Sequence, residues 1–382
     1  MRRIRRGHVL LAAVTAALCV PASGVSSSSD NSIITKVGKT EGQLNLIAWE
    51  GYTYKQWVNP FQKATGCRVK SKFGGSSDEM VTLMRTGQYD AVSASGDASL
   101  RLIFGKDVRP IDPKLIPDFK NFIPQLKSPP HNTVKGVHYG ISLQWGPNTL
   151  LYNTKKVKPA PNSWSALYSS KYKGKVTIPD NPIQIADAAL YLSKAKPSLG
   201  IKDPYELTQP QFNAAVDLLK KQHPLVRKYW LTAGDEIELF KNGDAVIGAA
   251  WPYQYSTLIA DHEPVQQIIP KEGATGWADT WMLATNAPHP NCAYLWAKWV
   301  STAQVQAEQA LSFGETPVNS KACAVMETME AGSCAKYHAD QTSSAYFSTI
   351  AFWKTPLATC DDGTNNCVPY AQWVAAWTTI KG

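Results

Sequence analysis

The sequence contains few of the residues on which catalytic and metal sites usually depend. It has 7 histidines among 382 residues, and it contains no serine-hydrolase elbow, phosphate-binding loop or dinucleotide-binding turn. No CxxC pair occurs, and the string that starts at His262 has Gln266 where a zinc protease needs its second histidine. The acidic loop at 361–366 lacks the spacing and the final Glu of a calcium loop. We therefore expect no metal and no cofactor.

Long apolar runs are also scarce. The segment Val9–Val20 is the longest, and it is too short to span a bilayer. Four arginines precede it and small residues follow it, which is the pattern of a cleaved export signal. We expect residues 1–25 to be a signal peptide, residues 26–42 to be a flexible leader, and the mature chain to be periplasmic or extracellular. Cys19 follows a leucine rather than a small residue, so we expect no lipid anchor.

The excess of positive charge is smaller than it first looks. The chain has 39 Lys and Arg against 30 Asp and Glu, a net charge of +9. Without residues 1–25, which hold four arginines and no acid, 35 basic residues face 30 acidic ones, a net charge of +5. So small an excess over the mature chain does not favour binding to a polyanion. We expect no nucleic-acid partner.

Six cysteines remain after removal of the signal peptide. Fifteen connectivities are possible, and an exported protein can form disulfides. Short loops favour the pairs Cys323–Cys334 and Cys360–Cys367, which leaves Cys67–Cys292. We therefore expect three structural disulfides rather than metal ligands.

What the sequence does contain is an alternation of short apolar strands and amphipathic helices. Strands are predicted over residues 43–49, 67–73 and 89–93, with helices between them. Ser76, followed three residues later by a glutamate, is the start of a capping box for the second helix. This βαβαβ order predicts an α/β fold with a mostly parallel sheet and helices on both faces.

Two long extended passages, residues 139–153 and 273–284, lie on either side of a second α/β block. This arrangement predicts two lobes joined by two crossovers, with a ligand between the lobes. We expect residues 43–144 and 271–382, including the C-terminal helices, to form the first lobe. Residues 145–270 are expected to form the second.

Six short motifs follow one another along the chain. They are Trp49–Tyr52, Tyr89–Val92, Trp251–Tyr253, Pro270–Gly273, Gly276–Asp279 and Thr316–Asn319. Their order and spacing resemble the spermidine/putrescine-binding proteins of bacterial ABC importers, over nearly all of residues 43–382. Residues 95–99 and 352–356 are similar to the branch associated with putrescine and γ-aminobutyrate uptake. The resemblance implies the two-lobed periplasmic-binding-protein fold (type II), with two hinge crossovers.

The resemblance also implies a ligand site made of aromatic walls and carboxylates. The positions of the aromatic box are matched by Trp49, Tyr52, Trp251 and Trp277. Each good contact between an aromatic face and a cation is worth about 0.5–2 kcal/mol. Asp279 matches the acid that holds an ammonium group, and Ser95 matches a hydroxyl at a strand end.

Several positions differ from the family pattern. The pair of acids that holds the other ammonium of a polyamine is replaced by Asn181 and Gln184. Two aromatic positions become Asp97 and Glu315, and a polar amide becomes Lys354. The loss of two carboxylates at one end weakens the case for a ligand with two or three positive charges. The two amides can still hydrogen-bond an amine, a hydroxyl or a carboxylate.

These differences leave two classes of ligand open. Lys228 or its neighbour Arg227 can receive a carboxylate, and together with Asp279 this would suit a zwitterion such as γ-aminobutyrate. A short diamine held by Asp279 with Asp97 or Glu315 is the other candidate.

We therefore predict an exported, monomeric solute-binding protein that closes over a small primary amine and delivers it to the membrane permease of an ABC importer. Putrescine, spermidine and γ-aminobutyrate are the candidate ligands, and closure requires only that the ligand binds the closed form better than the open form. The alternative from another class is a secreted hydrolase that uses Asp279 or Glu315 as a cleft carboxylate.

Overall fold

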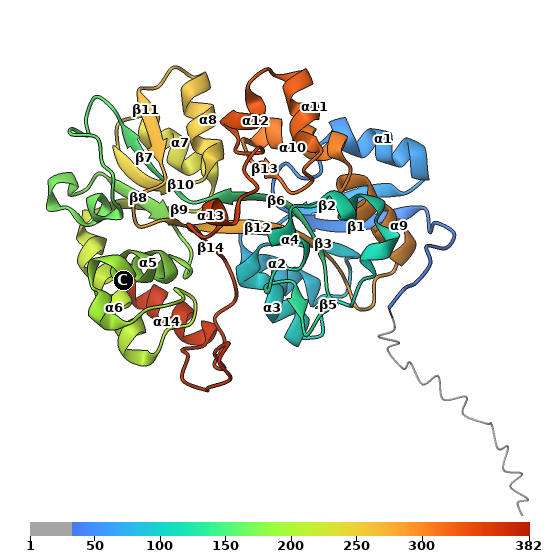
Figure 1. Cartoon of the computed structure of the whole chain (residues 1–382), viewed down its shortest axis with the longest axis horizontal. Helices are drawn as coiled ribbons and strands as arrows, with labels where there is room; N and C mark the ends of the chain where they lie inside the picture. The colour runs from blue at the N-terminus through green and yellow to red at the C-terminus, as the bar shows by residue number, and fades with distance from the viewer. Residues whose placement is uncertain (1–32) are drawn as a thin grey trace, which may run out of the picture. The chain divides into compact units, whose positions relative to one another are not determined.

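The described part of the chain folds as two lobes, each built on its own β-sheet (Figure 1). The computed structural model describes residues 33–382. The predicted signal peptide and residues 26–32 of the expected leader lie outside the described residues. None of the helices in the described range is long and apolar enough to cross a lipid bilayer.

The first lobe contains a seven-stranded sheet in the order β13-β6-β12-β3-β1-β2, with β14 paired to β12. Its strands are β1 (Gln43–Ala48), β2 (Arg68–Phe73), β3 (Ala91–Ala94), β6 (Ile141–Pro147), β12 (Ala274–Leu283), β13 (Thr316–Pro317) and β14 (Ile350–Phe352). Its helices are α1 (Lys55–Thr65), α2 (Ser77–Met84), α3 (Gly96–Phe104), α4 (Pro124–Lys127), α9 (Pro290–Val300), α10 (Ala303–Phe313), α11 (Ala322–Met329), α12 (Ser333–Lys336) and α13 (Ser344–Phe347). A small hairpin of β4 (Thr133–Val134) and β5 (Val137–His138) precedes β6.

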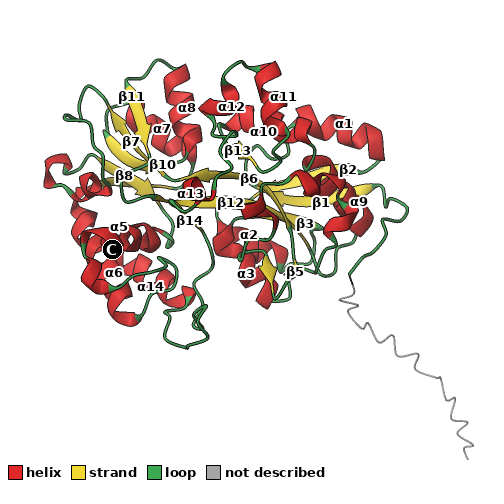
Figure 2. Cartoon of the chain, viewed as in Figure 1, coloured by secondary structure: helices red, strands yellow, loops and turns green. Residues whose placement is uncertain are grey.

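The second lobe contains a five-stranded sheet in the order β11-β7-β10-β8-β9. Its strands are β7 (Thr149–Asn153), β8 (Val176–Pro179), β9 (Val226–Trp230), β10 (Ile247–Ala250) and β11 (Val265–Ile268). The helices around this sheet are α5 (Gln184–Ala195), α6 (Gln209–Gln222), α7 (Ala233–Lys241), α8 (Pro252–Ala260) and α14 (Tyr370–Lys381). Figure 2 shows α5, α6 and α14 on one side of this sheet and α7 and α8 on the other.

Short 3₁₀ turns connect several of these elements. They are Pro113–Leu115, Pro117–Asn121, Trp164–Tyr168, Ser170–Tyr172, Pro197–Leu199 and His223–Leu225.

The two sheets are mixed rather than mostly parallel. The predicted βαβ units are present, because β1 pairs in parallel with β2 and β3, and β8 pairs in parallel with β9 and β10. The strands of the extended passages run the opposite way, so that β12 pairs antiparallel with β3 and β6, and β10 pairs antiparallel with β7. All ten residues of β12 are buried, Asp279 among them.

Three segments connect the lobes, one more than the sequence predicts. The two predicted crossovers join β6 to β7 and β11 to β12. The third leads from β14 to α14, which we expected to belong to the first lobe. The C-terminal helix packs instead on the second lobe, where the Trp373 ring lies 5.8 Å from the Phe212 ring and Trp377 Nε1 donates to Asp180. Its aromatic side chains complete the apolar core beside α6. The residues at which one lobe gives way to the other stay a prediction.

The described part of the leader is not loose. Ile34 and Val37 pack against the core of the first lobe. The Glu41 carboxylate accepts hydrogen bonds from the backbone N–H groups of Asn291 and Cys292, at 3.1 and 3.0 Å. Residues 34–41 are therefore held against the start of α9, contrary to the expectation of a flexible segment.

All three predicted disulfides are present. Cys67 and Cys292, separated by 225 residues, link the start of β2 to α9 in the core of the first lobe. Cys323–Cys334 joins α11 to α12, and Cys360–Cys367 closes a loop between the third crossover and α14. Cys67 and Cys292 are both fully buried.

Replacing Cys67 and Cys292 together by alanine should lower the free energy of unfolding by about 2–5 kcal/mol, because this disulfide closes a very long loop in the unfolded chain. The same replacement of Cys360 and Cys367, separated by only 7 residues, should cost less, because a short loop loses less entropy on closure. Denaturant unfolding followed by tryptophan fluorescence measures both. A larger loss of unfolding free energy on replacing Cys360 and Cys367 than on replacing Cys67 and Cys292 would contradict the expectation.

Candidate ligand-binding site

Three residues that lie on or just after strands of the first lobe meet near the carboxyl ends of β1 and β3. Trp49 follows β1 and Ser95 follows β3, and because these strands are parallel their carboxyl ends lie side by side. Asp279 lies on β12, whose next residue, Thr280, pairs with the last residue of β3. The fold therefore places an indole, a hydroxyl and a carboxylate next to one another from distant parts of the sequence.

Asp279 is the centre of this cluster. Its Oδ1 accepts a hydrogen bond from Ser95 Oγ at 2.5 Å, and its Oδ2 accepts one from the Tyr52 hydroxyl at 2.6 Å. Trp49 Nε1 donates to Ser95 Oγ at 3.1 Å. The structure thus brings together four of the residues that the sequence analysis selected. Only 4% of the Asp279 surface is exposed.

The turn that carries Tyr52 into this cluster requires a glycine. Gly51 has a φ of +100°, and a Cβ atom at this position would lie 1.5 Å from the Phe313 ring of α10. The chain can therefore follow this path only without a side chain at position 51. Phe313 also contacts the edge of Tyr52, with ring centroids 6.0 Å apart.

A second carboxylate flanks the same phenol. The Oε atoms of Glu315, between α10 and β13, lie 3.3 and 3.5 Å from the Tyr52 hydroxyl. Burial raises the pKa of Asp279 to about 7. Burial, together with the neighbouring Asp279 charge, raises the pKa of Glu315 well above its ordinary value. Tyr52 stays a neutral donor, because burial and the two acids raise its pKa as well.

Asp97 adds a third acid, in the first turn of α3. Its Oδ1 accepts from Ser77 Oγ at 2.8 Å, and its Oδ2 has no hydrogen-bond partner among the described residues. Burial raises its pKa, and its charge contributes to the raised pKa of Asp279. Asn181, in the second lobe, lies close enough for its amide to stabilise the Asp97 carboxylate. The predicted residues of the two lobes therefore meet at this point.

The remaining two members of the predicted aromatic box lie beside the second lobe. Trp251 caps the N-terminus of α8 and contacts Trp230 edge-on, with centroids 4.7 Å apart. Trp277 covers Gly146, where a Cβ would lie 2.7 Å from the indole. Both tryptophans pack against the same apolar core. Neither indole N–H has a hydrogen-bond partner among the described residues.

The prediction that Lys228 contributes to the site is wrong. Lys228 lies exposed on the edge strand β9, and its Nζ pairs with Asp235 at 2.7 Å. Its neighbour Arg227 is also exposed and pairs with Asp244 at 3.3 Å. On β9 it is Trp230 that turns into the core. Both cations are thus held by acids of their own lobe at the surface.

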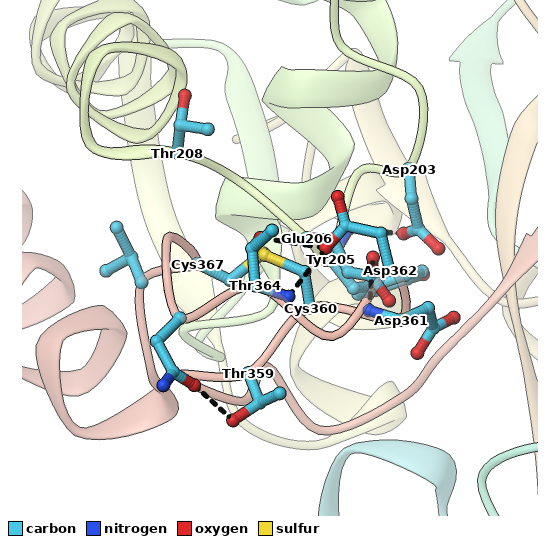
Figure 3. Close-up of a disulfide and its surroundings, with 12 residues drawn as sticks. Asp203, Tyr205, Glu206, Thr208, Thr359, Cys360, Asp361, Asp362, Thr364 and Cys367 are labelled. Carbon is cyan, nitrogen blue, oxygen red and sulfur yellow. Dashed lines mark hydrogen bonds between the residues drawn. A yellow bond between two sulfur atoms is a disulfide. The ribbon is translucent and has the colours of Figure 1, made fainter.

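Lys354 is buried, but it is fully engaged by acids outside the cluster around Asp279. Its ammonium pairs with Asp203 at 3.0 Å, with Asp361 at 2.9 Å, and with Glu206. Figure 3 shows these three acids near the Cys360–Cys367 disulfide. Their oxygen atoms lie close enough together to suggest a metal site. The lysine ammonium already supplies the positive charge that they need.

Gln184 is a predicted site residue at the start of α5, and Asp187, which was not predicted, lies one turn further along the same helix. Asp187 accepts a hydrogen bond from Thr275 Oγ1 at the start of β12, and Thr275 Oγ1 in turn accepts from Asn148 Nδ2 at 2.7 Å. Burial raises the pKa of Asp187 to about 7. The i, i+3 spacing from Gln184 was the signal that could have identified it, since such residues share a helix face.

Asp279→Asn should stabilise the ligand-free protein at pH 8 by about 1–4 kcal/mol, because the buried carboxylate then no longer has to ionise. The native pKa of Asp279, about 7, lies above the ordinary value of about 3.9. The contribution of Asp279 to the free energy of unfolding is therefore fully present below pH 4 and is lost as the pH rises through 7.

Thermal unfolding of the wild type and Asp279→Asn at pH 4 and pH 8 measures this effect. The two proteins should unfold at similar temperatures at pH 4 and separate at pH 8. A lower midpoint for Asp279→Asn at both pH values would contradict the expected cost of ionisation.

Comparison with known proteins agrees with this geometry. The family described as bacterial extracellular solute-binding protein matches residues 56–336. The putrescine/agmatine-binding protein of Pseudomonas aeruginosa is 23% identical over 344 residues, which cover 83% of this chain and 91% of the relative. The spermidine/putrescine-binding periplasmic protein of Escherichia coli is 25% identical over 248 residues, which cover 64% and 68%.

Solved structures show the same fold. A putative spermidine/putrescine ABC transporter protein from Listeria monocytogenes superposes with a TM-score of 0.74 at 17% identity, over 89% of this chain and 99% of that one. The protein described as the Atu4243-GABA receptor superposes with a TM-score of 0.65 at 18% identity, over 89% of this chain and 98% of that one. The fold is thus the type II periplasmic-binding-protein fold that the sequence predicts.

The family match spans well over half of the chain, and the two-lobed fold agrees with it. Members of this family are extracellular or periplasmic and bind solutes for ABC importers, so the hydrolase alternative is set aside. The chain belongs to the bacterial extracellular solute-binding proteins, the substrate-binding components of ABC importers.

Proposed function

We propose that this protein captures a small amine that carries positive charge and no carboxylate, of the putrescine and spermidine class. The observation that supports this most strongly is a group of three buried acids: Asp279 and Glu315 share the Tyr52 hydroxyl, and the charge of Asp97 is close enough to raise the pKa of Asp279. No described lysine or arginine forms an ion pair with any of them. A charged ammonium group supplies what they lack, because charge-assisted hydrogen bonds are the strongest in such surroundings.

This charge distribution favours a polyamine over a zwitterion. A ligand carboxylate placed next to Asp279, Glu315 and Asp97 would be repelled by their negative charge. The cations that could have received it, Arg227 and Lys228, are paired with acids at the surface. The names of the relatives point the same way, since putrescine, agmatine and spermidine all lack a carboxylate. We therefore place γ-aminobutyrate below the diamines in affinity.

The tryptophans give the site its second attraction. Trp49 is fixed at the end of β1 by its bond to Ser95, while Trp251 and Trp277 stand beside the second lobe. Flat aromatic faces cover the methylene chain of an amine and attract its charge.

Contacts between the lobes give the permease a closed form to recognise. Asn181 approaches Asp97, Tyr253 on α8 lies 6.0 Å from Phe313 on α10, and Arg101 on α3 lies 4.6 Å above the ring of Tyr370 on α14. A ligand that binds to both sides of the site makes these contacts more frequent, which shifts the population of lobes toward closure.

Calorimetric titration of the chain without residues 1–25 tests the proposal, with putrescine, spermidine and γ-aminobutyrate as ligands. We expect saturable binding of at least one polyamine and weaker binding of γ-aminobutyrate. Asp279→Ala should weaken binding by about 10- to 100-fold, the value of one or two charged hydrogen bonds. Asp217→Ala is the matched control, because Asp217 is exposed on α6.

Circular dichroism of each variant separates a lost ligand contact from a lost fold. Unchanged affinity in a folded Asp279→Ala protein would remove Asp279 from the site. The absence of heat with every amine tested would overturn the proposed ligand class while leaving the fold in place.

Amine affinity should rise with pH. Asp279, with a pKa of about 7, and Glu315, with a raised pKa, bind protons in the empty site, and an ammonium group must displace those protons. If binding displaces one such proton, the affinity for the amine rises about 10- to 30-fold between pH 5.5 and 7.5. Titrations in buffers of different ionisation enthalpy should show proton release on binding. A flat pH profile would mean that the ligand does not contact these acids.

A further inference from the structure

Trp251 is connected to two buried polar side chains of the second lobe, neither of which was predicted from the sequence. They are Gln254, in the first turn of α8, and Glu236, in α7. These two helices cover the same face of the second sheet (Figure 2). Glu236 and Gln254 have no exposed surface. Burying a polar side chain costs free energy unless it is hydrogen-bonded, so the bonds that these two residues form indicate what they do.

Two hydrogen bonds in series connect Glu236 to Trp251. The backbone N–H of Trp251 donates to Gln254 Oε1 at 3.2 Å, and Gln254 Nε2 donates to Glu236 Oε2 at 3.2 Å. The side-chain amide of Gln254 is therefore bonded at both ends, which fixes its orientation. Because Gln254 satisfies the N–H at the N-cap of α8, Glu236 holds the backbone from which the Trp251 indole projects.

The backbone of the second sheet packs closely around the Glu236 carboxyl group. A Cβ atom at Gly248 of β10 would lie 2.5 Å from Glu236 Oε1, so only glycine leaves room for the acid at this position. In the part of the chain that the structure describes, no lysine, arginine or histidine forms an ion pair with Glu236. Burial raises the pKa of Glu236 well above its ordinary value and so favours the uncharged acid. An uncharged carboxyl group still accepts the bond from Gln254.

The ring of Trp251 is held separately from its backbone. It meets Trp230 edge-on, with centroids 4.7 Å apart, and Trp230 Nε1 donates to the Ala249 carbonyl oxygen of β10 at 3.2 Å. Trp251 is only partly buried, so part of its ring is accessible. A cation is attracted to an aromatic ring when it lies over the ring face. A shift of the Trp251 indole therefore weakens any such contact.

We propose that Glu236, acting through Gln254, positions the Trp251 indole for the ligand. Glu236 and Gln254 are positioning residues, and Trp251 is the residue that meets the amine. This inference rests on the proposed amine-binding function and adds to it the support of one aromatic wall. Apolar side chains could fill the space between α7 and α8 without burying an acid, but they could not accept the hydrogen bond from Gln254.

A double-mutant cycle with putrescine tests this assignment. Trp251→Ala should weaken putrescine binding by about 3- to 30-fold, the value of one contact between a cation and an aromatic face. Glu236→Leu removes the acceptor for Gln254 and should weaken binding by about 3- to 10-fold, because the indole is shifted rather than removed. In the Trp251→Ala protein, Glu236→Leu should change the affinity by less than about twofold, because no indole remains to be positioned.

Two further variants of α7 complete the cycle. Glu236→Gln keeps an uncharged acceptor of the same shape, so it should recover most of the affinity that Glu236→Leu loses. Glu238→Leu is the matched control, because Glu238 is exposed on the same helix, and it should bind putrescine as the wild type does. Equal losses of affinity from Glu236→Leu with and without the Trp251 indole would overturn the positioning role.

Fluorine NMR of protein that contains fluorotryptophan separates this inference from the proposed function. The Trp251 resonance is identified by its loss in Trp251→Ala. Glu236→Leu should shift or broaden this resonance and leave that of Trp373, on α14 at the other side of the sheet, unchanged. An unchanged Trp251 resonance would overturn the inference even in a protein that binds amines. A shifted resonance in a protein that binds no amine would support the link from Glu236 to Trp251 and overturn the proposed ligand class.

Discussion

The burial of the Asp279 carboxylate without a cation is the constraint on which the rest of the site depends. Two hydroxyl donors, from Ser95 and Tyr52, hold its oxygen atoms, but hydroxyls do not remove its charge. Burial therefore keeps its pKa near 7, and Glu315 and Asp97 add to the same unfavourable charge. A protein core would normally pair or replace such acids. The proposed binding of an amine accounts for the concentration of three such acids in the first lobe.

The fold creates this situation by joining distant residues at strand ends. Trp49 and Ser95 meet because β1 and β3 are parallel, while Asp279 reaches them because β12 runs back across the first lobe. The same strand continues toward the second lobe, where Thr275 holds Asp187. One strand thus connects two buried acids that belong to different lobes.

Sequence reasoning succeeded where a residue's position follows from its place on a strand. Trp49 and Ser95 each lie at or just after the end of a predicted strand, and parallel strand order places such ends together, whereas Asp279 lies in the middle of the predicted passage 273–284. It failed for Lys228, because nothing in the local sequence shows that β9 is an edge strand with that side chain in solvent. The placement of α14 depends on packing between distant segments, which local periodicity does not reveal.

Buried acids that are ionised and unpaired cost free energy. The ammonium group of the proposed ligand would remove this cost and add charged hydrogen bonds. A ligand that binds the closed form better than the open form then shifts the population of lobes toward closure. Since a permease must distinguish loaded from empty protein, buried acids without cations provide a physical basis for that distinction: the closed form becomes favourable when the missing charge arrives.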